Sequence, residues 1–248
     1  NIILVMTDDL GYNDVGFNGQ EKIKTPHLDQ MAEEGMVFSQ FYSGSTVCAP
    51  SRCALMTGRH MGNAYLRGNT TEPLRAQDST MARMLKDAGY VTGMFGKWGL
   101  GEIGTSGDPA KKGFDQFTGY TNQVEAHYYY NDTIERIIDG TTQRVSIDSS
   151  TYNHEIEMQD ALDFIRSNKD TTFFAYLPLR LPHAELIAPD EDMEPYLDED
   201  GNSIFEEKPF VSDGHFPDQP MPRAAYAAMI TKLDNDMGKL LQLLREEG

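Results

Sequence analysis

The stretch TVCAPSRCALMTGR, residues 46–59, holds both cysteines of the chain. Cys48 lies just before a helical pattern at 50–58, which begins with proline and ends with glycine. The N-terminus of a helix attracts anions, and Arg52 can turn its guanidinium back toward Cys48, so this segment suits an anionic ligand. A buried structural cysteine is the alternative. A disulfide between Cys48 and Cys53 is not expected, because it would constrain little of the chain.

Two adjacent carboxylates, Asp8 and Asp9, follow the apolar run IILVMT at 2–7. Such a run predicts a strand buried on both faces. Like charges at the end of a buried strand repel each other unless a cation lies between them. Calcium or magnesium, which take oxygen ligands, would fit this pair. The alternative is that the acids only cap a turn after the strand.

The elements that would position these residues alternate between strands and helices. Further strands are predicted at 36–42, 90–97 and 171–178, and helices at 25–35, 79–88, 155–168 and 223–248. This alternation predicts an α/β fold with a mostly parallel central sheet and helices on both faces. The segment 101–154 is rich in Gly, Thr and Tyr and lacks a clear period, so we expect it to be an excursion above the sheet.

Ligands of such folds bind beyond the carboxyl ends of the strands. Lys97 ends one predicted strand, and His183 follows another. We therefore expect Lys97, His183 and the pair Asp8-Asp9 to converge on one edge of the sheet. Taken alone, Lys97 would be interpreted as a solvated lysine.

Composition excludes several classes of protein. The net charge of −18 argues against a nucleic-acid-binding protein, which needs a basic face. No apolar run is long enough to span a membrane. The opening NIILVMTDD is not an export signal and is interpreted as a mature or trimmed start. The acidic segment 190–207 is interpreted as a solvated surface loop.

Several motifs together resemble the type I, formylglycine-dependent sulfatases of the alkaline phosphatase superfamily. VCAPSRCALMTGR is similar to the family signature Cys-x-Pro-Ser-Arg followed by Thr-Gly-Arg. The opening NIILVMTDDLGYNDVG, the block GYVTGMFGKWGLG, the segment KKGFDQFTGY, the segment LPLRLPHAELIAP and the closing helix RAAYAAMITKLDNDMGKLL resemble further family motifs, in the family's order. The resemblance thus covers nearly the whole chain.

This resemblance implies a sulfuric ester hydrolase. A separate maturation enzyme would convert Cys48 to formylglycine, whose hydrated form is the nucleophile. Asp8 and Asp9, together with the converted Cys48, would bind Ca²⁺ or Mg²⁺. Arg52 and Lys97 would hold the modified side chain and the sulfate oxygens. The remaining implied roles fall to His183, which would contact the ester oxygen and protonate the leaving alcohol, and to Arg59, which would brace the loop.

One departure from the family concerns Gly99. Many sulfatases carry a histidine there, between Trp and Leu, as a candidate base for the elimination step. His127 is the proposed substitute, with a packed loop residue or a sugar contact as the alternatives. Asn122 and Gln123 are further substrate-binding candidates nearby.

A second departure lies at the end of the chain. The family completes its metal site after one more strand, and the LDND at 233–236 is expected to lie inside a helix and not to replace it. We therefore expect residues 1–248 to be the N-terminal part of a sulfatase catalytic domain, with weak metal binding and little activity on its own. A periplasmic or extracellular location is expected.

Two other functions stay open. A phosphate or phosphonate ester hydrolase of the same superfamily would share the metal-plus-nucleophile plan, and a non-catalytic sulfoglycan-binding protein would keep Cys48 unconverted. The expected substrate is a sulfated small molecule or oligosaccharide, whose sugar rings could stack on Tyr128, Tyr129 and Tyr130.

Overall fold

The computed structural model describes residues 1–212 and 214–247. Its strands are β1 (Ile2–Met6), β2 (Val91–Lys97), β3 (Gln116–Tyr120), β4 (Thr133–Ile138), β5 (Thr141–Ser146) and β6 (Phe173–Pro178). Its α-helices are α1 (Pro26–Glu34), α2 (Cys48–Thr57), α3 (Met81–Asp87), α4 (Asn153–Ser167), α5 (Asp190–Met193) and α6 (Pro222–Glu247). The chain divides into two compact units, the first comprising residues 1–6 and 40–180 and the second residues 7–39 and those from 181 onward.

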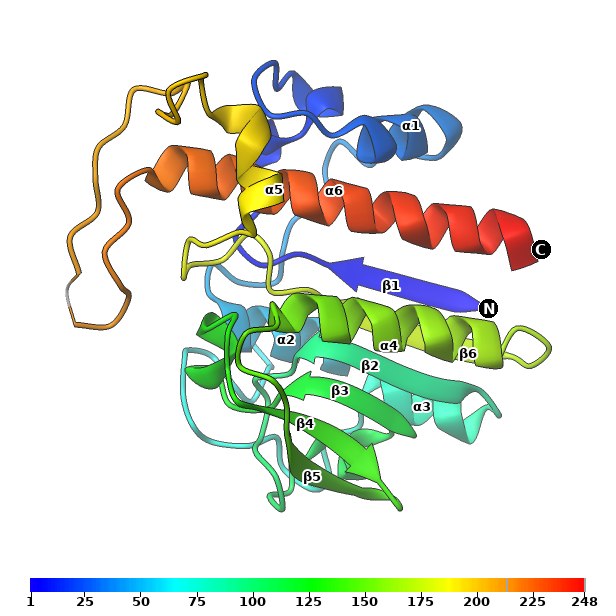
Figure 1. The fold of residues 1–248 in the computed structure, drawn as a ribbon. Helices are drawn as coiled ribbons and strands as arrows, with labels where there is room; N and C mark the ends of the chain where they lie inside the picture. Colours follow the sequence, from blue (N-terminus) through cyan, green and yellow to red (C-terminus); the bar gives the residue numbers. More distant parts are fainter. Residues whose placement is uncertain (213, 248) are drawn as a thin grey trace. The chain divides into compact units, whose positions relative to one another are not determined.

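The first unit contains the whole sheet, in the order β1-β6-β2-β3-β4-β5 (Figure 1). The pairs β1–β6, β6–β2 and β2–β3 are parallel, whereas β3–β4 and β4–β5 are antiparallel. The predicted mostly parallel sheet is therefore confirmed. Because β1, β6, β2 and β3 run the same way, their carboxyl ends lie at one edge, and Lys97 is the last residue of β2 at that edge.

Helices cover both faces of this sheet, as predicted (Figure 1). Successive residues of a strand point to opposite faces. In β2, Met94 packs into a core with residues of α2 and α3, such as Cys53 and Ala82. Its neighbour Phe95 instead contacts Phe164 of α4, with ring centroids 5.5 Å apart.

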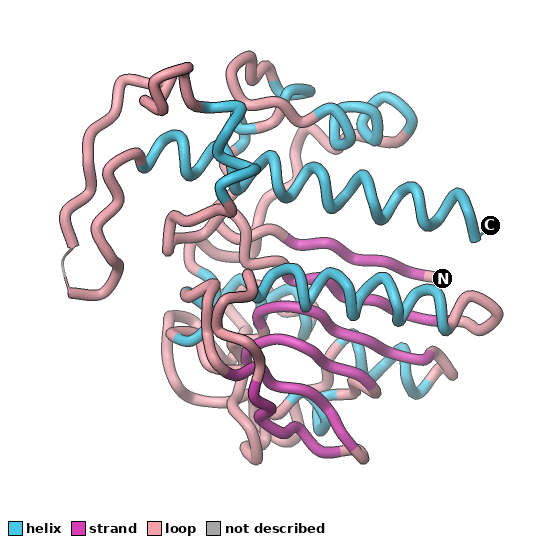
Figure 2. The backbone as a smooth tube through the Cα atoms, in the orientation of Figure 1, coloured by secondary structure: helices cyan, strands magenta, loops and turns pink. Residues whose placement is uncertain are grey.

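The expectation that 101–154 is an excursion above the sheet is wrong. The segment contributes β3, β4 and β5 to the sheet, shown in magenta in Figure 2. The turn between β4 and β5 is Asp139-Gly140, with φ of 51° and 74°. Positive φ angles at both residues are typical of a tight hairpin turn, and an Asp-Gly pair in the sequence is a strong signal for one. The signal was not used because the flanking residues show no clear alternation of apolar and polar side chains.

The strand expected at 36–42 is also absent. These residues form no strand in the described part of the chain, and Met36, Phe38 and Phe41 are exposed. The alternation of apolar residues there satisfies the local pattern of a strand. A strand also needs a neighbour to bond with its backbone, and the described residues supply none to 36–42.

The second unit is built around α6, which contacts α1 and α5. Asp234 of α6 accepts the N–H groups of His27 and Leu28, at 3.2 and 2.8 Å, at the start of α1. It thereby satisfies two of the free N–H groups of that helix. The expectation that LDND lies inside a helix is confirmed, since 233–236 fall within α6. No described helix is both long and apolar enough to cross a membrane.

Candidate functional site

Cys48 is the first residue of α2, with Val47 as its N-cap, so the helix starts two residues earlier than predicted. The thiol is partly buried and donates to Gln123 Oε1, with Sγ and Oε1 2.8 Å apart. A second amide oxygen, Asn69 Oδ1, lies 3.5 Å from Sγ and accepts the N–H of Ala49 at 3.3 Å. The absence of a disulfide is confirmed: both cysteines of the chain are free.

Two basic side chains of the first unit are buried near this helix. Arg52, one turn after Cys48, is 1% exposed, and its Nη1 donates to the carbonyl oxygen of Lys97 at 2.5 Å. Lys97 is also 1% exposed. Lys97 is therefore not the solvated lysine of the alternative interpretation. Burying a cation is costly unless anionic or hydrogen-bonding groups compensate it, and the Lys97 carbonyl does so in part for Arg52. Basic side chains beside the N-terminus of α2 fit an anion-binding role.

The loop after β3 carries Asn122, Gln123 and His127. The Asn122 side chain accepts the N–H of Val124 at 2.8 Å and donates to Glu102 Oε1, also at 2.8 Å, which fixes the start of the loop. Gln123 reaches Cys48, as described above. His127 ends a short 3-10 helix, Glu125–His127, and its catalytic role stays a prediction.

A buried ion pair, which was not predicted from the sequence, anchors this loop. Arg180 and Glu157 are fully buried, and Arg180 Nε lies 3.1 Å from Glu157 Oε1. Arg180 Nη1 donates to the carbonyls of Tyr128 at 2.7 Å and Ala126 at 3.4 Å. Burial raises the pKa of Glu157, and the Arg180 guanidinium opposes this rise. The available signal was an arginine directly after the buried strand TTFFAYLPL.

The second unit contains Asp8, Asp9 and His183. The N–H of Asp8 donates to the carbonyl of Leu181 at 3.1 Å, which ties the two segments together. His183 Nε2 lies 3.5 Å from Asp9 Oδ2, and its Nδ1 bonds to the carbonyl of Ala184. The structure thus brings two predicted site residues, Asp9 and His183, into contact.

The predicted metal site can be tested against these residues. Adjacent carboxylates are hard oxygen donors, the kind that Ca²⁺ and Mg²⁺ prefer, but Ca²⁺ takes about six to eight ligands. In the described ranges no group of three or more His, Cys, Asp or Glu side chains is arranged to hold a metal ion. Asp8 and Asp9 therefore match a hard cation in kind, but they form only part of a donor set.

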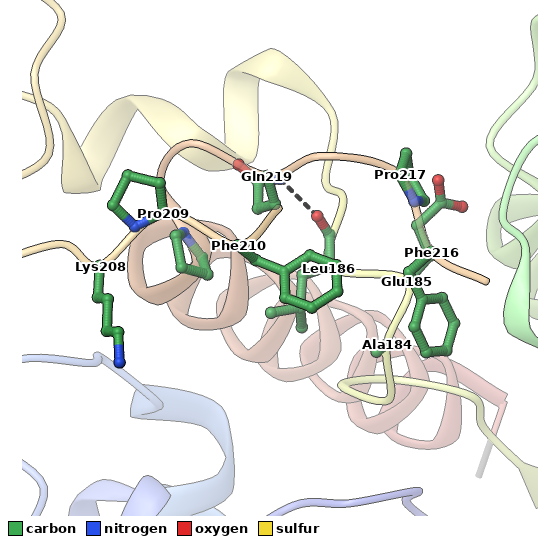
Figure 3. A pocket seen from close by; sticks show the side chains of 10 residues that line it. Ala184, Glu185, Leu186, Lys208, Pro209, Phe210, Phe216, Pro217 and Gln219 are labelled. Atoms are coloured by element: carbon green, nitrogen blue, oxygen red, sulfur yellow. Dashed lines mark hydrogen bonds between the residues drawn. The ribbon is translucent and has the colours of Figure 1, made fainter. Parts of the chain in front are cut away.

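An apolar pocket of about 350 Å³ lies in the second unit, beginning at the residue after His183 (Figure 3). Its lining includes Leu186, Pro209, Phe210, Phe216, Pro217 and Pro222. Gln219 Nε2 donates to the carbonyl of Leu186 at 2.6 Å and so ties two walls together. Two aromatic rings among prolines suit the flat apolar face of a ring-shaped ligand.

Comparison with known proteins agrees with the predicted family. The sulfatase family model matches residues 1–248. The chain is 30% identical to N-acetylgalactosamine-6-sulfatase of Canis lupus familiaris, over 99% of this chain and 47% of that protein. It is 31% identical to an arylsulfatase of Klebsiella aerogenes, over 100% of this chain and 63% of that protein.

Among solved structures, Ps i-CgsB in complex with k-i-k-neocarrahexaose superimposes with a TM-score of 0.78 at 29% identity, covering 100% of this chain and 55% of that one. The chain thus spans about half the length of the proteins it matches. The family model covers the chain from its first residue to its last, and the chain belongs to the sulfatase family.

Proposed function

We propose that the protein hydrolyses sulfate monoesters of carbohydrates, with Cys48 as the precursor of its nucleophile. The observation that carries this proposal is the position of Cys48 at the N-terminus of α2, with Arg52 and Lys97 buried in the same unit. A sulfate ester repels nucleophiles through its negative charge, and buried cations offset that repulsion. Converted to formylglycine, position 48 would supply a geminal diol, with one hydroxyl to attack sulfur and a second to release the sulfate.

The other predicted residues take the roles that the family resemblance implies. Arg52 and Lys97 would bind sulfate oxygens. His183, whose Nδ1 bonds to the Ala184 carbonyl, would hold its exchangeable proton at Nε2 and pass it to the leaving alcohol. Asp8 and Asp9 would be part of a Ca²⁺ or Mg²⁺ site.

The proposed substrate is a sulfated glycan. N-acetylgalactosamine-6-sulfatase names a sulfated sugar, and Ps i-CgsB was solved with a carrahexaose. The apolar pocket after His183 would take a ring on the leaving-group side of the ester. Replacing Phe210 by alanine should raise KM about three- to tenfold with little change in kcat. Val211→Ala is the matched control, since Val211 is exposed and does not line the pocket.

The proposal also includes a partner and a location. Conversion of Cys48 requires a formylglycine-generating enzyme, and we propose export to the periplasm or the extracellular space.

The deciding experiment is a peptide mass for the fragment containing Cys48, from the full-length protein made together with a formylglycine-generating enzyme. A mass for thiol exchanged for aldehyde is expected, and Cys53→Ala should not change it. Turnover of sulfated sugars should exceed that of phosphate esters and vanish in Cys48→Ala. An unmodified Cys48, or a preference for phosphate, would contradict the proposal.

A further inference from the structure

Beside Cys48, the side chain of Gln123 lies close to where a side chain on Gly99 would begin. The backbone of Gly99 has a φ of +71°, a conformation that costs other residues about 1–2 kcal/mol. A Cβ at this position would lie 3.2 Å from Cγ and 3.4 Å from Cδ of Gln123. Any side chain at position 99 would therefore press on Gln123, and glycine leaves that space to the amide.

Gln123 uses this space to reach the thiol. Its Oε1 accepts from Cys48 Sγ at 2.8 Å, which is short for a hydrogen bond to sulfur. A cavity of about 60 Å³ beside the amide is lined in part by Gly99, Asn122 and Gln123 and has room for water. The amide oxygen faces the side chain at position 48.

The loop that carries Gln123 is anchored on both sides. The N–H of Thr121, two residues before it, donates to the buried Glu135 at 2.7 Å. On the other side, Arg180 holds the carbonyl of Tyr128. These contacts limit how far the Gln123 side chain can move away from Cys48.

We propose that Gln123 is a positioning residue for the side chain at position 48, and that Gly99 is required because Gln123 occupies the space above it. This inference rests on the proposed function for its catalytic meaning. A carboxamide does not take up a proton near neutral pH, so Gln123 orients the nucleophile and does not act as its base.

The test uses unconverted protein, made without the maturation enzyme, and follows alkylation of Cys48 by iodoacetamide at one fixed pH. The hydrogen bond to Oε1 restrains Sγ and must break before the sulfur can be alkylated. Gln123→Ala should therefore speed alkylation about three- to tenfold, the effect of one neutral hydrogen bond. Gln123→Glu should slow it by a similar factor, because a carboxylate accepts a stronger hydrogen bond than a carboxamide does. The exposed neighbour offers a control, Val124→Ala, which should leave the rate unchanged.

A double-mutant cycle tests the part played by Gly99. Gly99→Ala should move the Gln123 side chain by a few tenths of an ångström and speed alkylation less than Gln123→Ala does, and adding it to Gln123→Ala should change the rate little further. Equal rates in wild type, Gln123→Ala and Gln123→Glu would overturn the proposal even if Gly99→Ala fails to fold. In converted enzyme, Gln123→Ala should lower kcat more than it changes KM. The alkylation rate is measured without converting Cys48 to formylglycine and without enzymatic turnover. It can therefore support or contradict the role of Gln123 independently of the proposed function.

Discussion

Replacing Arg180 by methionine is expected to destabilise the protein by about 3–5 kcal/mol, the usual cost of removing one partner from a buried ion pair. Arg180 and Glu157 are both fully buried, with Arg180 Nε 3.1 Å from one carboxylate oxygen and 3.2 Å from the other. The substitution leaves the Glu157 carboxylate without this counter-charge. It also removes one of the two side-chain donors to the Tyr128 carbonyl, the other being Asn131 Nδ2.

A second substitution separates the cost of the uncompensated charge from the loss of packing. In Arg180→Met/Glu157→Met, neither charge of the pair remains, and similar replacements elsewhere are often neutral or stabilising. The double variant should therefore regain most of the stability lost by Arg180→Met. A residual loss of about 0.5–1.5 kcal/mol is expected, because the Tyr128 carbonyl loses its hydrogen bond from Arg180 and keeps only the one from Asn131 Nδ2.

The pH dependence of Arg180→Met has a definite sign. Burial raises the pKa of Glu157, and removing the guanidinium takes away an effect that lowers it. Folded Glu157 then binds a proton at pH values where the unfolded residue is ionised. Stability must therefore rise as pH falls from 7 toward the ordinary glutamate range, by up to about 1.4 kcal/mol per pH unit.

Urea unfolding followed by circular dichroism measures these differences, with the midpoints compared at constant slope. At pH 7 the urea midpoint should be highest for wild type, lower for the double variant and lowest for Arg180→Met. At pH 5 the difference in midpoint between the double variant and Arg180→Met should be smaller. If the double variant is no more stable than Arg180→Met at pH 7, the charge of Glu157 is not the cause and the reasoning fails.

Three further predictions concern the first unit. A hydrogen bond from Arg75 lowers the pKa of Asp78, so the contribution of this carboxylate to stability is present above the ordinary aspartate range and lost as pH falls through the lowered value. Asp78→Asn should therefore cost about 1–3 kcal/mol at pH 7 in urea unfolding, and the difference from wild type should close as pH falls below the ordinary aspartate range. Thr80 caps α3 through its side chain, so Thr80→Ala should lower stability by about 1–2 kcal/mol and Thr80→Ser by much less in the same assay. A Cβ on Gly119 would lie 1.9 Å from the carbonyl oxygen of Gly96, so Gly119→Ala should yield insoluble protein on expression; soluble protein with native circular dichroism would contradict this packing.

Prediction from the sequence succeeded where a segment's own pattern decides its structure. The apolar run of β1, the proline and glycine that bound α1 and the long periodic pattern of α6 each carry their signal locally. The prediction that β1 is buried on both faces is wrong, because β1 is an edge strand of the sheet and its residues are partly buried or exposed. Prediction failed where pairing with another segment decides whether a strand forms. Residues 36–42 have a strand pattern and no strand, whereas β3 has two glycine or threonine residues in five and still pairs with β2.

The site residues likewise fall into those that a local motif predicts and those that depend on packing. Cys48 and Arg52 stand in one short motif, and Lys97 at the end of a strand, so their positions could be inferred from sequence. Arg180 and Glu157 are 23 positions apart, and the residues around each of them do not indicate the other as its partner. A buried ion pair of this kind depends on how α4 packs beside β6, which only the folded chain reveals.

Gly99 shows how a departure from a family pattern can be interpreted once the fold is known. In the sequence, a glycine in place of the family histidine means that a candidate base is missing, which led to the proposal of His127 as its substitute. In the structure, a Cβ at position 99 would lie 3.2 Å from Gln123 Cγ and the backbone there has a positive φ, so both features favour glycine. It follows that restoring histidine at position 99 alone should harm the site, since its Cβ would meet Gln123, while Gly99→His combined with Gln123→Ala would relieve that contact.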